Sequence, residues 1–511
     1  MKNKSKLLHL MITLIISLSV VFTGCSKEDD NTLVDTSKTK NNEISEKETK
    51  EESVDITWII RTTPQKDMDK VVEKMNQILK EKINIKLNLV AIDPGVYNET
   101  MRMKLATGED FDICFSANWV NDFYGNVARD AFLPLNDLLK KYSPQTYKMI
   151  PEDFWGAVTI NGEIYGVPNY QIVANQRGII IHKDIVDKYQ FDINSIKKLE
   201  DVEPLLAKIE KGEPKNVIPF LNYKDGKWAE MNNYYGIIVI GERSLPGVIK
   251  KDDDSFTVIN QYESPEFIEH INLMRDWYQK GYISIDSATL TDILAIMKSG
   301  NTPVIYTDMK PGGKAEMEKL LGYKEIVEIP LETPTVSTAN ISATLQAINK
   351  NSKHPVESMH LIELINNDKE LYNLMCFGIE NVHYKKVADN RIEPIGNSGY
   401  APNKAWSYGN QFNAYLVPGQ EDDIWEDTVK LNNSVEASKL LGFVFDAEPI
   451  KAEMAQCKSV VDEFGPGLWT GTIDIDQYYD QFIEKLKAVG SEKIIAEKQK
   501  QLNEWRTANN K

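Results

Sequence analysis

Cysteine is scarce in this chain, and the few cysteines form no recognisable pattern. The four are Cys25, Cys114, Cys376 and Cys457, and no two of them make a C-x-x-C pair. Cys114 lies in the strand-like FDICFS and Cys376 in the apolar NLMCFG, so the sequence predicts small core residues rather than disulfide partners or nucleophiles. The six histidines are scattered, and without a cluster of cysteine and histidine a transition-metal site is not expected.

Motifs of catalysis and nucleotide binding are missing as well. The sequence contains no G-x-S-x-G, H-E-x-x-H, P-loop or G-x-G-x-x-G motif. One enzyme class stays open, because a surface glycosidase needs only a pair of carboxylates and the chain has 76 acidic residues. The formal net charge of −17 opposes nucleic-acid binding, which depends on contacts of Lys and Arg with phosphate. We therefore expect a protein that is not an enzyme and has no cofactor or metal.

Only one apolar run approaches the length of a membrane span, and it stands at the N-terminus. Three lysines within the first six residues precede apolar residues 7–22, and Thr23 and Gly24 lead to Cys25. This arrangement predicts a secretory signal over residues 1–24. A cysteine directly after two small residues resembles the bacterial lipobox, although Phe22 stands where that motif favours leucine. The resemblance implies acylation of Cys25 and anchoring to the outer face of the cell membrane, with plain secretion or a retained apolar anchor as alternatives.

A polar leash follows Cys25. Residues 26–54 contain no aromatic residue and few large aliphatic ones, so they cannot bury enough surface to offset the entropy of the chain. We therefore assign residues 25–54 to a lipidated, disordered tether. The rest of the chain, residues 55–511, is too long for one ordinary core and is expected to form two lobes.

Strand and helix patterns alternate from residue 55 onward. DITWII, INIKLNLVAI and FDICFSA have strand character, and a helix with Thr63 as its N-cap is expected between the first two. Such a series indicates a parallel sheet covered by helices, in which ligands bind at the carboxyl ends of the strands. Farther along, Ser264 as N-cap, Pro265 in the first turn and Gly281 as the stop delimit a clear helix. The fold class is α/β.

Several phrases, in order, resemble extracellular solute-binding proteins of the sugar ABC-importer type, in their Gram-positive lipoprotein branch. They are GEDFDICF, ARDAFLPLNDLL, INGEIYGVPN, IIIHKDIVDKYQFD, ATLQAINKNSKHPVESMHLIELI and FGIENVHY. The resemblance implies a periplasmic-binding-protein-like fold whose chain crosses between two lobes near YGVPNYQ and ISATLQAI. The boundaries that follow are residues 55–168 and 342–395 for lobe 1, and residues 169–341 and 396–511 for lobe 2.

The same resemblance implies a transport function. A monomeric, membrane-tethered receptor would capture a carbohydrate, an oligosaccharide in size, by closing its lobes, and would deliver it to an ABC permease. Three alternatives stay open: a peptide or polyamine cargo, a sensor role for the same fold, and a surface glycosidase.

Candidate ligand-binding residues follow from the chemistry of a sugar, which presents apolar C–H faces and a rim of hydroxyl groups. Asn118 and Trp119 directly follow the strand FDICFS, and Arg61 ends the first strand. Tyr170 and Gln171 lie at the inferred crossing. Packing is the alternative role for Trp119 and Tyr170, and a solvated surface charge the alternative for Arg61.

The second group of candidates comes from the remaining two thirds of the chain. Trp228 stands in the polar, glycine-containing YKDGKWAEMNNYYG, and Asp308 follows the strand TPVIYTD. Trp406, Asn410 and Gln411 combine stacking and amide chemistry in APNKAWSYGNQF. A local packing role for Trp228 and a turn or helix cap for Asp308 are the alternatives.

Overall fold

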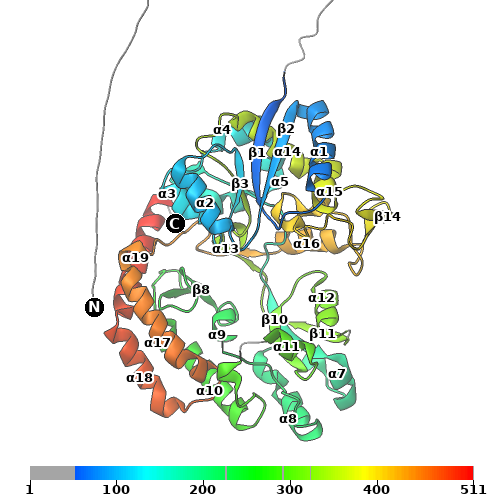
Figure 1. Cartoon of the computed structure of the whole chain (residues 1–511). Coiled ribbons are helices and arrows are strands. Elements are labelled where there is room, and N and C mark those ends of the chain that lie inside the picture. The colour runs from blue at the N-terminus through cyan, green and yellow to red at the C-terminus, as the bar shows by residue number, and fades with distance from the viewer. Residues whose placement is uncertain (1–51, 225–226, 291–292, 323, 510–511) are drawn as a thin grey trace, which may run out of the picture. The chain divides into compact units, whose positions relative to one another are not determined.

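The computed structural model describes residues 52–224, 227–290, 293–322 and 324–509 (Figure 1). The predicted signal, Cys25 and the leash as far as residue 51 lie outside the described residues. Within the described part, no helix is long and apolar enough to cross a membrane.

Lobe 1 is built on a five-stranded sheet with the strand order β2-β1-β3-β13-β6. Strands β1 (Val54–Arg61), β2 (Ile85–Ile92) and β3 (Ile113–Ser116) are parallel. Strands β13 (Leu345–Ile348) and β6 (Val167–Pro168) complete the sheet as an antiparallel extension. The carboxyl ends of β1 and β3 therefore share one edge, as the strand pattern predicted.

Helices and hairpins surround this sheet. On α1 the buried residues Met68, Val71, Met75 and Leu79 recur at helical spacing and face the sheet core. The helices of lobe 1 are α1 (Met68–Ile83), α2 (Tyr97–Thr107), α3 (Phe123–Ala128), α4 (Asn136–Tyr142), α5 (Pro144–Met149), α6 (Glu152–Trp155), α13 (Thr338–Ile341), α14 (Pro355–Asn367), α15 (Lys369–Phe377) and α16 (Ile424–Asn433). Its hairpins are β4 (Thr159–Ile160) with β5 (Glu163–Ile164), and β14 (Tyr384–Ala388) with β15 (Arg391–Pro394).

Lobe 2 has a smaller, antiparallel sheet. Strand β7 (Arg177–His182) lies between β10 (Val304–Asp308) and β11 (Ile326–Pro330), and β8 (Ile237–Val239) pairs separately with β9 (Val248–Lys250). The helices of lobe 2 are α7 (Lys183–Tyr189), α8 (Glu203–Gly212), α9 (Lys227–Glu230), α10 (Pro265–Gln279), α11 (Ile293–Lys298), α12 (Gly313–Leu320), α17 (Lys451–Trp469), α18 (Ile475–Ala488) and α19 (Ser491–Asn509). In Figure 1 the last three helices lie together along one side of this lobe.

Local signals located some helix ends correctly and others not. Ser264 caps α10 by accepting a hydrogen bond from the amide of Phe267, and Gly281 follows the helix with a φ of +80°, as predicted. The predicted cap at Thr63 is wrong, because α1 begins at Met68 after Asp67. The hydroxyl of Thr63 instead donates to the carboxylate of Asp93, 2.9 Å away.

The boundaries between the lobes differ from the prediction at two places. Residues 169–341 were assigned to lobe 2, but Val336 and Ile341 belong to the hydrophobic core of lobe 1. The larger difference lies at the C-terminal side. Residues 396–511 were assigned to lobe 2, but Tyr400, Tyr408 and Ala414 belong to the hydrophobic core of lobe 1. Lobe 2 regains the chain only after β16 (Glu436–Ala437), and Leu440 and Phe443 are the first residues of this segment in its cores. The chain therefore crosses between the lobes three times, whereas the sequence placed the last crossing about forty residues too early.

The three remaining cysteines are buried core residues, as predicted. Cys114, Cys376 and Cys457 are free thiols, and none is exposed. Burial raises the pKa of the Cys114 thiol to about 12 and that of Cys457 to about 11. Such thiols stay protonated at neutral pH, which removes the thiolate that a nucleophile or metal ligand requires.

Candidate ligand-binding cleft

The three crossing segments run side by side. The amide of Asn175 donates to the carbonyl of Thr335 at 2.8 Å, and the amide of Thr335 donates back at 3.0 Å. Strand β12 (Thr335–Val336) pairs in parallel with β16 through hydrogen bonds of 2.9 and 2.8 Å. Two cavities open beside these segments, and both have walls from each lobe.

The first cavity has a volume of 670 Å³. Lobe 1 contributes Asn118 and Trp119, and lobe 2 contributes the end of β10 and α12. Its floor is the first crossing segment, residues 171–176. This is the size and the mixture of aromatic and amide groups typical of a small-molecule site.

Trp119 is the aromatic platform of this cavity. Its side chain is 50% exposed, an unusual state for a large apolar residue. The indole Nε1–H donates to the carbonyl of Ala343 at 2.8 Å, Phe115 meets the ring edge-on, and the guanidinium of Arg61 lies 5.0 Å from the ring centroid. The ring is thus fixed in place while half of its surface stays accessible to a ligand.

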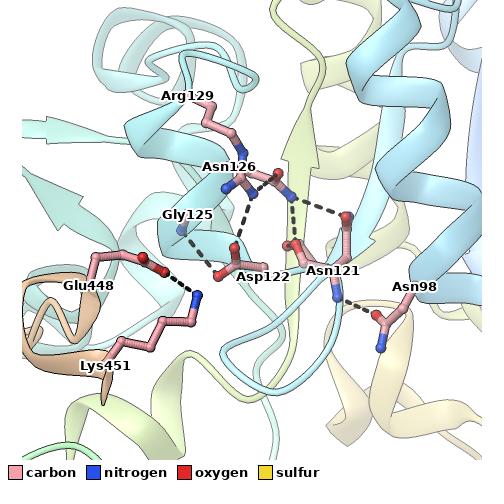
Figure 2. A network of polar contacts seen from close by, with 9 residues as sticks. Asn98, Asn121, Asp122, Gly125, Asn126, Arg129, Glu448 and Lys451 are labelled. Carbon is pink, nitrogen blue, oxygen red and sulfur yellow. Dashed lines mark hydrogen bonds and ion pairs between the residues drawn. The ribbon is translucent and has the colours of Figure 1, made fainter. Parts of the chain in front are cut away.

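A polar network holds the loop that carries Asn118 and Trp119. Figure 2 shows the amide of Asn121 donating to the side chain of Asn98, and the side chain of Asn126 donating to the carbonyl of Asn121. Asp122 caps α3 by accepting from the amide of Gly125 at 3.2 Å. The loop is therefore ordered before any ligand arrives.

The second cavity has a volume of 430 Å³ and lies against strand β8. Amide side chains from both lobes line it, namely those of Asn118, Asn175, Asn232, Asn233 and Asn340. It shares Asn118, Asn175 and Asn340 with the first cavity, so the two are parts of one cleft. Amides can donate to and accept from hydroxyl groups, as a hydroxyl-rich ligand requires.

An ion pair between a buried arginine and an exposed aspartate joins the two parts of the cleft. Arg177 is 8% exposed, and its Nε donates to Asp308 at 2.6 Å. Burial opposes the charge of Arg177, but Asp308 and Glu230 outweigh it, so the pKa of this guanidinium is above its usual value. Behind the pair, the hydroxyl of Tyr306 donates to Glu332, and burial raises the pKa of Tyr306 well above its usual value. The guanidinium of Arg177 is therefore charged at neutral pH.

Four of the ten predicted binding residues line the cleft: Asn118, Trp119, Gln171 and Asp308. Gln171 is 9% exposed and donates to the hydroxyl of Thr344 at 2.9 Å. Asp308 is bound to Arg177, so it presents a neutralised carboxylate to the cavity.

The other six predicted residues do not line either cavity. They are Arg61, Tyr170, Trp228, Trp406, Asn410 and Gln411. Tyr170 packs edge-on against Phe412 with ring centroids 4.8 Å apart, and Trp406 meets Phe115 edge-on at 6.1 Å. These aromatics therefore support the wall of lobe 1.

Trp228 and the amides after Trp406 have structural contacts of their own. Trp228 is 1% exposed on α9 and packs against Phe267, so no ring face is free for a ligand. Asn410 caps a short 3₁₀ turn, and the backbone amide of Gln411 donates to the carbonyl of Tyr170 at 2.9 Å. Trp228 thus has the packing role that the sequence left open as the alternative.

Sequence reasoning missed Arg243, which lines both cavities. It follows β8 in the segment GERSLPG, and a charged residue after the apolar GIIVI is the signal that could have indicated it. It also missed Asn340, which lies in the short helix α13. Among the described residues, no group of His, Cys, Asp and Glu side chains is arranged to hold a metal ion.

Two lobes, a cleft between them and three crossing segments define a two-lobed solute-binding protein. The family of bacterial extracellular solute-binding proteins matches residues 62–370, which is more than half of the chain. The chain belongs to this family. A domain of unknown function (DUF3502) matches residues 439–507, which include α17, α18 and most of α19.

Relatives of known function cover nearly the whole chain. A carbohydrate ABC transporter substrate-binding protein of Streptococcus pneumoniae is 28% identical over 450 residues, which are 86% of this chain and 88% of the relative. The polygalacturonan/rhamnogalacturonan-binding protein YtcQ of Bacillus subtilis is 21% identical over 97% of this chain and 98% of the relative.

Solved structures of solute-binding proteins are also similar to this chain. The crystal structure of the N-glycan transport solute binding protein (NgtS) from Streptococcus pneumoniae has a TM-score of 0.77 and 26% identity, covering 90% of this chain and 100% of that chain. NgtS in complex with Man1GlcNAc has a TM-score of 0.62 and 27% identity, covering 88% of this chain and 99% of that chain. The predicted two-lobed α/β fold is confirmed.

Proposed function

We propose that this protein captures an oligosaccharide in the cleft between its lobes and delivers it to the permease of an ABC importer. The observation that carries the proposal is the half-exposed ring of Trp119 in a 670 Å³ cavity shared by both lobes. A sugar face can stack on this ring while Asn118, Asn175 and Asn340 bind its hydroxyl groups. The carbohydrate and N-glycan relatives support this cargo over a peptide or polyamine.

Lobe closure is the proposed means of capture. The crossing segments pair through only a few backbone hydrogen bonds, so a small change in them can rotate one lobe against the other. NgtS has a TM-score of 0.77 against this chain and its complex with Man1GlcNAc one of 0.62, a difference that closure of the lobes on the glycan would account for. Closure would bring Asp308 and Arg243 of lobe 2 onto a ligand stacked on Trp119 of lobe 1.

Binding without catalysis is part of the proposal. Three carboxylates of the cleft, Asp308, Glu316 and Glu436, are each paired with a basic side chain at 2.6 to 2.9 Å. The fourth, Glu230, accepts a hydrogen bond from the hydroxyl of Tyr223 at 3.1 Å. Glycoside hydrolysis needs two carboxyl groups that act directly on the substrate, and an ion pair with a basic side chain works against that role. Incubating the protein with the glycan that binds and following reducing ends over hours tests this point, and turnover would refute it.

The anchor completes the proposed function. Acylation of Cys25 would hold the receptor at the extracytoplasmic face of the membrane, and the leash would keep it within reach of its permease. Mass spectrometry of the N-terminal peptide from membranes tests the anchor, because an acylated Cys25 at the new N-terminus adds the mass of the lipid.

Calorimetric titration of the purified chain tests the cargo. We expect a neutral N-glycan such as Man5GlcNAc, or another oligosaccharide, to bind with a Kd at or below about 1 μM, whereas peptides and spermidine give no heat. Trp119→Ala should weaken binding about tenfold to a hundredfold, because it removes the stacking surface. Met103→Ala is a matched control, since Met103 is 51% exposed on α2 and does not line either cavity. Binding of a peptide but of no carbohydrate would contradict the proposal.

A further inference from the structure

The loop between β8 and β9 is fixed in an unusual way. Side chains from elsewhere in the chain hold four consecutive carbonyl groups, those of residues 244–247. Tyr262 donates to the first at 2.6 Å and Gln261 to the second at 2.7 Å. Lys498 donates to the third and fourth at 2.7 and 3.1 Å. A loop held at four consecutive carbonyls has less conformational freedom to lose when a ligand binds.

Lys498 reaches the loop from α19 and is fully buried. Gly247 has a φ of +109°, and a Cβ at this position would collide with the Lys498 side chain. The loop and the C-terminal helix are therefore fitted closely to each other. The region matched by the domain of unknown function thus helps to build the wall of the cleft.

Arg243 is the residue that this loop presents. Its side chain is exposed and lines both cavities. Within the part of the chain that the structure describes, it makes no hydrogen bond or ion pair. Other basic side chains of the cleft are each paired with a carboxylate. They are Arg177, Lys251, Lys310 and Lys439.

The charge balance of the second cavity is opposite to that of the chain. Four basic and two acidic side chains line it, although the net charge of the protein is −17. Closing the lobes over an unpaired guanidinium would remove its water, which is costly unless an anionic partner replaces it. A carboxylate matches the fork of an arginine with two parallel hydrogen bonds.

We propose that Arg243 and the loop Gly241–Gly247 form a subsite for the carboxylate of an acidic glycan. This inference rests on the proposed carbohydrate-binding function and specifies the class of its ligand. Trp119 lines the same cavity from the opposite lobe, so one ligand can stack on the ring and place a carboxylate at Arg243. A uronic acid and a sialic acid carry the same group, and both fit this chemistry.

Two matched ligand pairs test the subsite on the purified chain. One pair is trigalacturonic acid and its full methyl ester, and the other is sialyllactose and lactose. We expect the acid member of at least one pair to bind ten to a hundred times more tightly than its neutral partner. Which pair shows the preference identifies the source of the carboxylate.

Variants then connect the preference to Arg243. Arg243→Gln should abolish the preference for the acid while changing the affinity for the neutral partner less than about threefold, and Arg243→Lys should retain part of it because the charge remains. Arg102→Gln should leave both affinities unchanged, because Arg102 is ion-paired with Glu99 on α2 and lines neither cavity.

The possible outcomes distinguish failure of the carboxylate subsite from failure of the proposed carbohydrate-binding function. Equal affinity for acid and neutral partners, or tight binding of Man5GlcNAc with no acidic ligand bound, would overturn the carboxylate subsite and leave the carbohydrate receptor in place. If no carbohydrate binds, both the carboxylate subsite and the carbohydrate-binding function are wrong.

Discussion

The buried ammonium group of Lys498 makes the stability of this protein depend on pH in a way that can be measured. Lys498 is fully buried, and burial lowers its pKa from 10.5 to about 7, although Glu242 and Cys457 favour the charged form. In the unfolded chain the pKa returns to its ordinary value. Between these two values the unfolded state binds more protons than the folded state, so stability rises with pH.

The size of the effect follows from the linkage relation. Each pH unit inside the window changes the free energy of unfolding by about 1.4 kcal/mol, and the change from pH 7.5 to 9.5 amounts to about 2.5 kcal/mol. Lys498→Met removes the titrating group and keeps the length of the side chain. We therefore expect the wild-type protein to gain about 2.5 kcal/mol over this range relative to Lys498→Met.

Urea unfolding at pH 7.5, 8.5 and 9.5 measures this difference. Other groups that titrate in the range are shared by both proteins and cancel. Lys500→Met is the control on the same helix, because Lys500 is 61% exposed in its ion pair with Glu497, and its curve should run parallel to that of the wild type. Parallel curves for wild type and Lys498→Met would show that Lys498 titrates normally and would refute the lowered pKa of its buried amino group.

Four substitutions test other parts of the structure. Trp228→Ala should lower the free energy of unfolding by about 3 to 5 kcal/mol because the ring is 1% exposed, whereas Trp119→Ala, with a ring that is 50% exposed, should cost only about 1 kcal/mol in urea unfolding and act mainly on affinity. Asn432→Ala should cost about 2 to 3 kcal/mol in the same assay, because this side chain, 2% exposed, bonds the backbone of the first crossing segment at three points; an unchanged midpoint would refute that role. Gly178→Ala should lower the melting temperature by more than about 5 °C in calorimetry, because its Cβ would collide with the carbonyl of Ile329 on β11, and normal melting would contradict the strand pairing.

The parallel part of lobe 1 was predictable because its signals are local. Each of β1, β2 and β3 is an apolar segment bounded by turn residues, and the cap and stop of α10 lie within its own sequence. Thr63 failed as a cap signal because its hydroxyl is used in a contact with Asp93, thirty residues away. A local sequence pattern cannot show that a residue distant in the chain takes the hydrogen bond of a potential capping side chain.

The last crossing could not be predicted from a pattern. Strands β12 and β16 are two residues long, which is too short for any periodicity. The aromatic residues before β16 are equally compatible with either lobe, and only tertiary packing places Tyr400 and Tyr408 in the core of lobe 1. The error in the boundary has this physical origin.

Some of the candidate site residues were predictable from the sequence and others were not. The rule that ligands meet the carboxyl ends of strands located Asn118, Trp119 and Asp308, which follow or end strands and line the cleft. Composition alone selected Trp228, since an indole in a polar, glycine-containing segment has the same sequence signature whether it stacks on a ligand or fills a core. Burial decides between these roles, and Trp228 is buried by α10 and by the C-terminal helices that share its core.

Side-chain hydrogen bonds fix both walls of the cleft, and fixed walls suit a receptor that closes on its ligand. On one wall, side-chain hydrogen bonds fix the loop of Trp119, and on the other, Lys498 and its neighbours fix the loop of Arg243. The crossing segments pair through two-residue strands. Free energy from ligand binding is therefore not spent on ordering the walls and remains available for moving them together. Because α19 supplies Lys498, this helix helps to fix one wall of the cleft, although it lies far along the chain from the strands that line the cleft.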